Sequence, residues 1–430
     1  MKKTLRPFQE IGSRFLQERH YALLADEMGL GKTVQAIDAV YRLGLRRVLV
    51  VCPASVRSGW RQELTECLRG PAAGWRIVSY NEASAGKVPA GDLDLLILDE
   101  AHYLKTPTSN RCQAVFHNKN GLARRAKRVW ALTGSPVLNR PVELYPLLKT
   151  MAAPAIHPFT TFALYAHQFC GAFWDGRGLN VRGASNLPDL RRRLDGFMLR
   201  RTQEEVLEEL PELIVMRVPI SLDAAAERRI AEFEREVQDR EALLSPTREE
   251  YSALGDMATL MRVTGEAKVP AAADYIDQLL ETENKVVVFA HHRDVVAMLA
   301  KALDAHGVVT FQGGMSDGQK TEAIRAFQQA NGPRVFIGNI KAVGTGIDGL
   351  QDVAADVVFA ELSWVPEEMK QAIFRLKRMG QKRRRVRAHV LHALGTLESA
   401  VLNTHDGKNA VIDKLFGRGE KETAGLGGLW

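Results

Sequence analysis

Cysteine and aromatic residues are scarce in this sequence, and it has no long apolar run. Its 430 residues include four cysteines, which form no Cys-x-x-Cys pair and no metal-binding spacing with histidine, so neither a disulfide framework nor a zinc site is expected. No apolar segment is long enough to span a bilayer, and no signal peptide opens the chain. The sequence therefore predicts an intracellular, soluble protein of a reducing compartment, without a membrane partner.

Aromatic residues make up 7% of the chain and rarely lie among its basic residues, which argues against gripping a single nucleic-acid strand mainly by base stacking. The hydrophobic fraction of 46% and the charged fraction of 25% are those of an ordinary globular chain, and the length suits two or three domains. The net charge of +7 favours a polyanionic partner such as nucleic acid, although many basic proteins bind none.

Short apolar runs recur along the chain with amphipathic stretches between many of them, a pattern typical of buried parallel strands alternating with helices. The predicted strands are 48–51, 93–98, 129–132, 286–290, 308–311, 335–337 and 357–360. The first three lead into polar or glycine-bearing turns at 53–55, 99–102 and 133–136. Because ligands of open α/β sheets bind outside the carboxyl ends of strands, these turns are candidate binding positions.

The strongest motif ends in Gly31-Lys32-Thr33 at the start of a predicted helix. Glycines such as Gly29 and Gly31 let the backbone wrap a phosphate with its amide groups. Lys32 would bind the β- and γ-phosphates of a nucleotide, and the Thr33 hydroxyl would ligate Mg²⁺. The motif departs from the strict P-loop because Asp26 occupies the first glycine position. Taken alone, it could also be a tight turn with a basic neighbour.

A second motif, Asp99-Glu100-Ala101-His102, follows the apolar run 93–98 and spells a DEAH box. Asp99 at the strand end could hold Mg²⁺, and Glu100 could orient and deprotonate an attacking water. Two acids after a strand are, by themselves, more often the N-cap of a helix. Downstream of a Gly-Lys-Thr loop, the catalytic interpretation is favoured.

A third motif, in residues 371–381, contains Gln371, Arg375 and Arg378. The two arginines are three residues apart, which predicts that they share one face of a helix. From an opposing lobe they could reach a γ-phosphate as arginine fingers. A solvated basic helix is the alternative.

Residues 154–269 are rich in Arg and Glu and have few strand-like runs, and 224–244 alternates charges as a solvated helix does. We therefore expect an α/β fold of two lobes, with parallel sheets flanked by helices and helical insertions between the lobes. The expected domains are an ATP-binding lobe (1–153), the insertion (154–269), a second lobe (270–395) and a tail (396–430) whose function the sequence does not indicate.

From residue 5 to residue 381, these motifs resemble the SWI/SNF-type branch of superfamily two helicases. Further segments that carry the resemblance are Leu5-Arg6-Pro7-Phe8-Gln9, Val50-Val51-Cys52-Pro53-Ala54-Ser55-Val56, Ser79-Tyr80-Asn81, Ala131-Leu132-Thr133-Gly134-Ser135-Pro136 and Phe197-Met198-Leu199-Arg200-Arg201-Thr202. The resemblance implies that Gln9 reads the adenine and that the loop with Pro53 and Ser55 touches a DNA phosphate. It also implies a coupling and DNA-contacting role for four more residues: His102, Thr133, Gly134 and Ser135.

The second half of the chain shares the resemblance. Residues 265–269 and 285–292 are most similar to the annealing-helicase subgroup, and Gly344-Thr345-Gly346-Ile347-Asp348 resembles the family's fifth motif. That similarity implies that Gly346 binds nucleotide and that Gly344 and Thr345 contact DNA. Asp348 stands where Asn or Thr is usual, and an acid repels a phosphate, so its role stays open. Two further departures are Ser135 in place of the commoner Thr and Phe374 in place of an acid.

The resemblance implies two RecA-like lobes that use ATP and Mg²⁺ to move along double-stranded or branched DNA, remodelling DNA structures or protein–DNA complexes. One alternative is a strand-separating DNA or RNA helicase, which the 197–202 signature disfavours. Another is an ATP-gated DNA-binding module with little turnover, which the intact Asp99-Glu100 and Arg375/Arg378 pairs disfavour. We expect a monomer in the cytoplasm of a bacterium or phage-infected cell, near the nucleoid, with a DNA-bound protein as a further candidate partner.

Basic clusters could form the DNA track, although a solvated face is the commoner role of any one of them. They are 124–128, 191–193, 200–201 and 382–385. Arg200 and Arg201 could instead fix the contact between lobe and insertion. His291 and His292 are expected to be structural residues rather than metal ligands.

Overall fold

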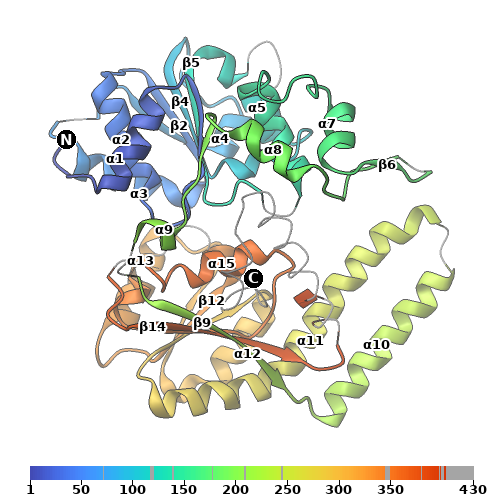
Figure 1. The fold of residues 1–430 in the computed structure, drawn as a ribbon. Helices are drawn as coiled ribbons and strands as arrows, with labels where there is room; N and C mark the ends of the chain where they lie inside the picture. Colours follow the sequence, from blue (N-terminus) through green and yellow to red (C-terminus); the bar gives the residue numbers. More distant parts are fainter. Residues whose placement is uncertain are drawn as a thin grey trace. The chain divides into compact units, whose positions relative to one another are not determined.

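The computed structural model describes residues 1–70, 72–116, 121–137, 140–176, 178–207, 210–243, 246–343, 349–378, 380–396, 398 and 401–402. The described chain forms two compact units that divide after residue 208 (Figure 1). Within these residues, no helix combines the length and the apolar character needed to cross a membrane.

In the first unit, six parallel strands form a sheet with the order β3-β2-β4-β5-β1-β8. The strands are β1 (Tyr21–Leu24), β2 (Val48–Cys52), β3 (Trp75–Ser79), β4 (Leu93–Asp99), β5 (Ala126–Leu132) and β8 (Met198–Leu199). All five residues of β2 are buried, because helices cover both faces of the sheet. This double burial explains why the central strands read as continuous apolar runs.

Helices pack on the two faces of this sheet through separate apolar clusters. One cluster joins α1 (Pro7–Gln17), α2 (Lys32–Leu43) and α3 (Arg57–Cys67) to the sheet through residues such as Ile37, Trp60 and Trp130. The other includes residues of α4 (Tyr80–Ser84), α5 (Asn110–Phe116), α6 (Tyr145–Met151), α7 (Phe162–Phe169) and α8 (Leu187–Leu194). A short antiparallel hairpin of β6 (Phe173–Trp174) and β7 (Leu179–Asn180) and the short helix α9 (Gln203–Val206) complete the unit.

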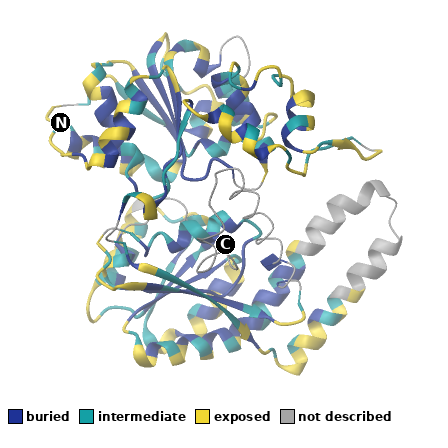
Figure 2. Ribbon diagram, in the orientation of Figure 1, coloured by how far each residue is buried: buried dark blue, intermediate teal, exposed yellow. Residues whose placement is uncertain are grey.

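The second unit has the same plan, with six parallel strands in the order β11-β12-β10-β13-β14-β9. The strands are β9 (Glu212–Ile220), β10 (Val286–Ala290), β11 (Val308–Phe311), β12 (Val335–Asn339), β13 (Asp356–Phe359) and β14 (Arg385–Ala393). The helices are α10 (Ala224–Leu243), α11 (Pro246–Thr282), α12 (Arg293–Ala302), α13 (Asp317–Gln328), α14 (Ile340–Val343) and α15 (Pro366–Ile373). Two apolar clusters again lie on opposite sheet faces, and Figure 2 shows the buried strands in dark blue.

The predicted α/β architecture is confirmed, and all seven predicted strands are present. They correspond to β2, β4, β5, β10, β11, β12 and β13. The charge-alternating segment is the helix α10, with Glu227, Arg228 and Arg229 exposed. The sequence missed the other described strands, which are β1, β3, β6, β7, β8, β9 and β14.

The missed strand β9 lies within the segment that the sequence described as mostly helical. It is a half-buried edge strand whose apolar run is interrupted by Arg217 and Pro219. Its partner in the described sheet, β14, pairs with it over nine residues but lies 173 positions further along the chain. Because that pairing is remote in sequence, local pattern could not reveal it.

The predicted insertion, residues 154–269, is divided between the two units, because the chain changes unit after residue 208. In addition, α11 continues through the predicted boundary at 269 and ends at Thr282. The role of 154–269 as an insertion that distinguishes this branch remains a prediction. The predicted tail, 396–430, lies almost wholly outside the described residues.

A buried ion pair ties α11 to the end of β14. The Lys268 Nζ atom lies 2.7 Å from Oε1 of Glu398, and the two side chains are 1% and 2% exposed. The same ammonium donates to the carbonyl oxygen of Leu391 at 2.7 Å, and Oε2 of Glu398 accepts from the amide of Ala393 at 2.8 Å. Both charges are therefore compensated by their partner and by backbone hydrogen bonds.

We expect Lys268→Met to destabilise the second unit by about 3–5 kcal/mol, because Glu398 would remain buried without its cation. The double variant Lys268→Met/Glu398→Gln should recover part of that loss, because it leaves no uncompensated charge. Urea denaturation and hydrogen exchange of the β14 amides measure the effect, and Lys301→Met, an exposed change on α12, is the control. A single variant as stable as the wild type would contradict this assignment.

Candidate active site

The phosphate-loop motif lies between β1 and α2. Gly29 and Gly31 have φ angles of 80° and 74°, which glycine adopts without steric cost. A Cβ atom on Gly31 would also lie 2.6 Å from Nε2 of Gln9, so a side chain there would displace the Gln9 amide. The Lys32 ammonium, at the start of α2, donates to the carbonyl oxygen of Asp26 at 2.7 Å. The loop thus has the tight curvature that phosphate-binding loops require.

Gln9 lies beside this loop on α1. Its side-chain nitrogen donates to the carbonyl oxygen of Leu30 at 3.3 Å, and its side-chain oxygen accepts from the amide of Arg6 at 3.0 Å. Thr33, in the first turn of α2, is half-buried. The residues predicted to bind nucleotide in the first unit therefore lie together, while their role remains a prediction.

Asp26, the departure from the strict P-loop, is a buried structural carboxylate. Its Oδ1 atom accepts from Nε of Arg201 at 2.9 Å, and its Oδ2 atom accepts from Nε2 of Gln35 at 3.1 Å. Arg201 also donates to Oε1 of Gln35 at 3.1 Å and to the carbonyl oxygen of Phe8. These contacts give Arg201 a structural role, which the sequence offered as the alternative to DNA binding.

The residues after β8 hold the phosphate loop as well. The amide of Gln203 donates to Oε2 of Glu27 at 2.8 Å, and Nε2 of Gln203 donates to the carbonyl oxygen of Met28 at 2.6 Å. The sequence identified the 197–202 segment as a signature but did not connect it to the loop. No local pattern connects these segments, because Asp26 and Arg201 are 175 positions apart.

Asp99 ends β4 and is buried, with hydrogen bonds to both carboxylate oxygens. Nε1 of Trp60 donates to Oδ2 at 2.7 Å, and the amide of Glu100 donates to Oδ1 at 3.0 Å. Burial and the adjacent charge of Glu100 raise the pKa of Asp99 to about 6, while the Trp60 hydrogen bond and the charge of Lys32 lower it. Asp99 and the hydroxyl of Thr33 are oxygen donors of the type that Mg²⁺ prefers, so the residues fit that ion.

Glu100 adopts a left-handed backbone conformation, with φ of 50° and ψ of 52°, which costs a non-glycine residue about 1–3 kcal/mol. Its Oε2 atom lies 3.2 Å from Nδ1 of His102. That histidine nitrogen also lies 3.0 Å from Oγ1 of Thr133, which accepts from the amide of Ser135 at 3.1 Å. A continuous polar chain therefore joins the acidic turn to the residues after β5.

The motifs meet because β4, β5 and β1 are adjacent and parallel, so their carboxyl ends lie at one edge of the sheet. A Cβ atom on Gly134 would lie 3.4 Å from Nζ of Lys32 and 2.8 Å from Cγ of Met28. Pro53 and Ser55 follow β2, which is the neighbour of β4, and Pro53 begins a short 3-10 helix at Ala54–Val56. The turns that the sequence predicted as binding positions therefore lie at one edge of the sheet, while their use in binding remains a prediction.

In the second unit, Gln371 lies on α15, but the two arginines do not. The helix ends at Ile373, and Arg375 and Arg378 lie in the hydrogen-bonded turns that follow. The prediction that they share a helix face is therefore wrong, because the helix ends one turn earlier than the sequence suggested. Both arginines are half-buried, and burial lowers the pKa of Arg378.

Four predicted positions lie outside the described residues: Gly344, Thr345, Gly346 and Asp348. Elsewhere in this unit, Glu361 binds the two histidines that the sequence singled out. Its Oε2 atom accepts from the amides of His291 and His292 at 2.8 Å each, and its Oε1 atom lies 2.7 Å from Nδ1 of His292. These contacts give His292 a structural role.

Part of the basic cluster 124–128 is also used within the protein. Lys127 pairs with Asp94 at 3.0 Å, and Arg128 donates to the carbonyl oxygen of Arg19 at 2.9 Å. These side chains are therefore structural contacts as well as surface charges.

We expect Trp60→Phe to destabilise the first unit by about 1.5–3 kcal/mol at pH 8, because it removes a buried hydrogen bond to an ionised carboxylate. The folded pKa of Asp99 lies above that of an unfolded aspartate, so below about pH 6 the carboxyl is neutral and the loss should shrink. Urea unfolding midpoints at pH 8 and pH 5 measure this dependence. Trp75→Phe is the control, because Trp75 lies near Trp60, with ring centroids 6.4 Å apart, and makes no hydrogen bond to Asp99. Equal losses at both pH values would contradict the prediction.

Comparison with known protein families gives two matches that cover most of the chain. Residues 8–88 and 77–262 match the SNF2-related domain, and residues 271–380 match the Helicase conserved C-terminal domain. One similar structure, the Sulfolobus solfataricus SWI2/SNF2 ATPase core in complex with dsDNA, covers 99% of this chain and 96% of that one at 20% identity, with a TM-score of 0.44.

Two relatives illustrate the similarity in sequence. The DNA annealing helicase and endonuclease ZRANB3 of Mus musculus is 32% identical over 98% of this chain. The SWI/SNF-related matrix-associated actin-dependent regulator of chromatin subfamily A-like protein 1 of Xenopus tropicalis is 33% identical over 92% of it. The chain spans 42% and 43% of the lengths of these relatives. With a domain match over more than half of its residues and relatives of this identity over nearly all of it, the chain belongs to the SNF2-related, SWI/SNF-type family of superfamily two.

Proposed function

We propose that this chain is a DNA-stimulated ATPase that moves along double-stranded DNA and remodels DNA structures or protein–DNA complexes. The observation that supports this most is the meeting of Lys32, Asp99 and Glu100 at one edge of the first sheet, in a chain of the SNF2-related family. Phosphoryl transfer to water requires a cation that binds the phosphates, an oxygen ligand for a metal ion and a base beside that ligand.

The first unit supplies most of the nucleotide site in this proposal. Lys32 and the loop amides bind the phosphates of ATP, Gln9 contacts the adenine, and Thr33 and Asp99 hold Mg²⁺. Mg²⁺, when bound, neutralises charge on the phosphate oxygens. Glu100 accepts a proton from the attacking water, because its carboxylate directly follows the proposed metal ligand Asp99 in the turn.

The second unit supplies the charges that act during hydrolysis. Arg375 and Arg378 act as arginine fingers on the γ-phosphate, and Gln371 and Gly346 contact the same nucleotide. Arginine suits this role because its guanidinium stays charged even where burial lowers its pKa. Arginine fingers contribute about 10³–10⁵ in rate in phosphoryl-transfer enzymes.

The proposed DNA contacts are to the backbone. Pro53, Ser55, Gly344 and Thr345 contact phosphates, which carry no sequence information, so sequence preference should be weak. The polar chain from Glu100 through His102 to Thr133 couples the nucleotide site to these contacts. Support for DNA as the partner comes from the relatives, one of which is named a DNA annealing helicase and endonuclease.

The Glu100→Gln protein should bind ATP but lose turnover with duplex DNA by about 10²–10⁴, because an amide cannot accept the proton of water. Lys32→Ala should instead lose ATP binding. We would measure ATP hydrolysis without DNA and with duplex, single-stranded, forked and RNA ligands, together with ATP binding by a fluorescent analogue. Glu66→Gln, an exposed change in the same unit, is the control.

Two outcomes of this assay would contradict the proposal. Wild-type turnover of Glu100→Gln with duplex present would show that another group is the base. Negligible turnover of the wild-type protein with every nucleic acid would favour the ATP-gated binding module.

The protein should displace the third strand of a triplex in the presence of ATP and leave a long simple duplex unmelted, because it grips one duplex backbone without separating the strands. The logarithm of its duplex affinity should fall with the logarithm of salt by about 0.9 per neutralised phosphate. A strand-displacement gel measures the first property, with Lys32→Ala as the inactive control. Robust unwinding of the duplex, or stimulation by single strands or RNA alone, would favour the helicase alternative.

A further inference from the structure

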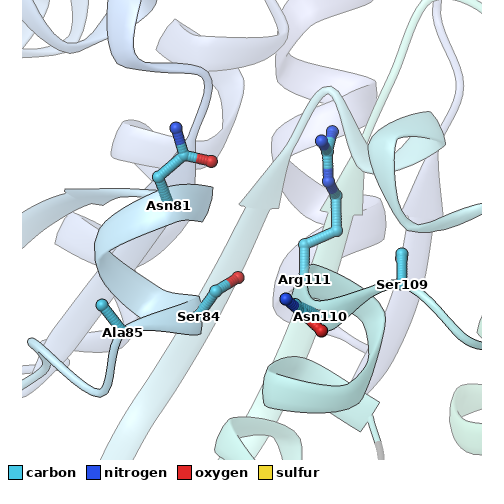
Figure 3. Close-up of a pocket in the computed structure, with 6 residues that line it drawn as sticks. All are labelled: Asn81, Ser84, Ala85, Ser109, Asn110 and Arg111. Atoms are coloured by element: carbon cyan, nitrogen blue, oxygen red, sulfur yellow. The ribbon is translucent and has the colours of Figure 1, made fainter.

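A polar pocket of about 430 Å³ lies between α4 and α5 of the first unit. Figure 3 shows the two sides: Asn81, Ser84 and Ala85 on one and Ser109, Asn110 and Arg111 on the other. The sequence singled out Ser79-Tyr80-Asn81 as a motif, yet the nucleotide site uses none of these residues.

The lining suits an anion. Arg111 is the one charged residue among the described residues that line the pocket, and the others are two amides, two hydroxyls and an alanine. Asn81 and Asn110 are exposed, and their amide groups can each donate hydrogen bonds. A guanidinium with neutral donors around it and no carboxylate in the lining matches the singly charged phosphate of a nucleic-acid backbone.

A stack of rings connects this pocket to the acidic turn. The guanidinium of Arg111 lies 5.3 Å from the ring centroid of Tyr103, and the rings of Tyr103 and Tyr80 are stacked at 5.7 Å with an interplanar angle of 3°. The hydroxyl of Tyr80 then donates to the backbone carbonyl of Asp99 at 2.9 Å. Tyr80 is buried, so its ring cannot move without disturbing that hydrogen bond.

The same stack also contacts the next residue of the turn. The amide of Tyr103 donates to the carbonyl oxygen of Glu100 at 2.9 Å. Glu100 has φ of 50°, a conformation that persists only where its surroundings hold it. Tyr80 and Tyr103 therefore each hold one peptide of the turn that carries the proposed metal ligand and base.

We propose that the pocket beside Arg111 binds a backbone phosphate of duplex DNA, and that the Arg111–Tyr103–Tyr80 stack is a positioning element that makes ATP turnover depend on that phosphate. The inference rests on the proposed function and adds a DNA contact and a route from it to Asp99 and Glu100. A phosphate that draws the guanidinium into the pocket changes its contact with Tyr103, and the rings transmit the change to the turn. Coupling between sites is reciprocal, so ATP alters DNA affinity by the same factor as DNA alters ATP affinity.

The test compares Arg111→Ala, Tyr103→Leu and Tyr103→Phe with the wild-type protein, using a duplex of fixed length. We would measure the duplex dissociation constant across 50–200 mM salt and the ratio of turnover at saturating duplex to turnover without DNA. Arg69→Ala, which removes an exposed arginine of the same unit that does not line the pocket, is the control and should leave both quantities unchanged.

Arg111→Ala should bind duplex more weakly and reduce the salt slope by about 0.9, the value for one phosphate. Tyr103→Leu should keep the wild-type salt slope but lower the stimulation ratio by about fivefold or more, the usual range of coupling between sites. Tyr103→Phe should retain stimulation, because its ring can still stack. The circular dichroism and thermal midpoint of each variant separate a loss of coupling from a loss of folding.

A wild-type salt slope in Arg111→Ala would overturn the phosphate site, and a wild-type stimulation ratio in a folded Tyr103→Leu would overturn the coupling route. If Tyr103→Leu does not fold, the stimulation ratio of Arg111→Ala at saturating duplex decides the coupling, because this change removes the guanidinium from the Tyr103 ring and leaves the buried Tyr80 in place. A wild-type ratio in that variant would overturn the coupling route. A wild-type protein that duplex does not stimulate would refute the proposed function and this inference with it. If duplex stimulates the wild-type protein and the variants keep its salt slope and stimulation ratio, this inference alone would be refuted.

Discussion

The buried contact between Asp26 and Arg201 is the constraint on which the candidate site depends. Asp26 is fully buried and Arg201 nearly so, and Gln35 binds both of them. In a buried pair of this kind, loss of one partner typically costs about 3–5 kcal/mol, because the other charge stays uncompensated. An aspartate at a position where P-loops usually have glycine is thus explained, since its carboxylate joins the loop to a segment 175 residues away.

The same contact organises several segments around the phosphate loop. Arg201 donates to the carbonyl oxygen of Phe8 in α1. Two residues later, Gln203 donates to the Glu27 carboxylate and to the carbonyl oxygen of Met28. The loop is therefore held by the start of the unit and by its last strand together. A loop held in this way is pre-organised, so less ordering has to accompany phosphate binding.

Parallel pairing accounts for the rest of the arrangement. Because β4, β5 and β1 are neighbours and all run in one direction, the residues that follow them lie at one edge of the sheet. No local sequence pattern links these residues. The polar contacts of His102 with Glu100 and Thr133 then fix their relative position. The pocket beside Arg111 is linked to this edge through Tyr80, which makes a second, aromatic connection to Asp99.

Sequence alone determined the features that depend on neighbouring residues. These include the glycines that allow positive φ before Lys32, the acids that end β4 and the continuous apolar strands buried on both faces. Only the tertiary structure decided features that join remote segments: the pairing of β9 with β14 and the burial of Asp26 against Arg201. The physical reason is that strand pairing and desolvation are set by partners far along the chain, so no local spacing encodes them.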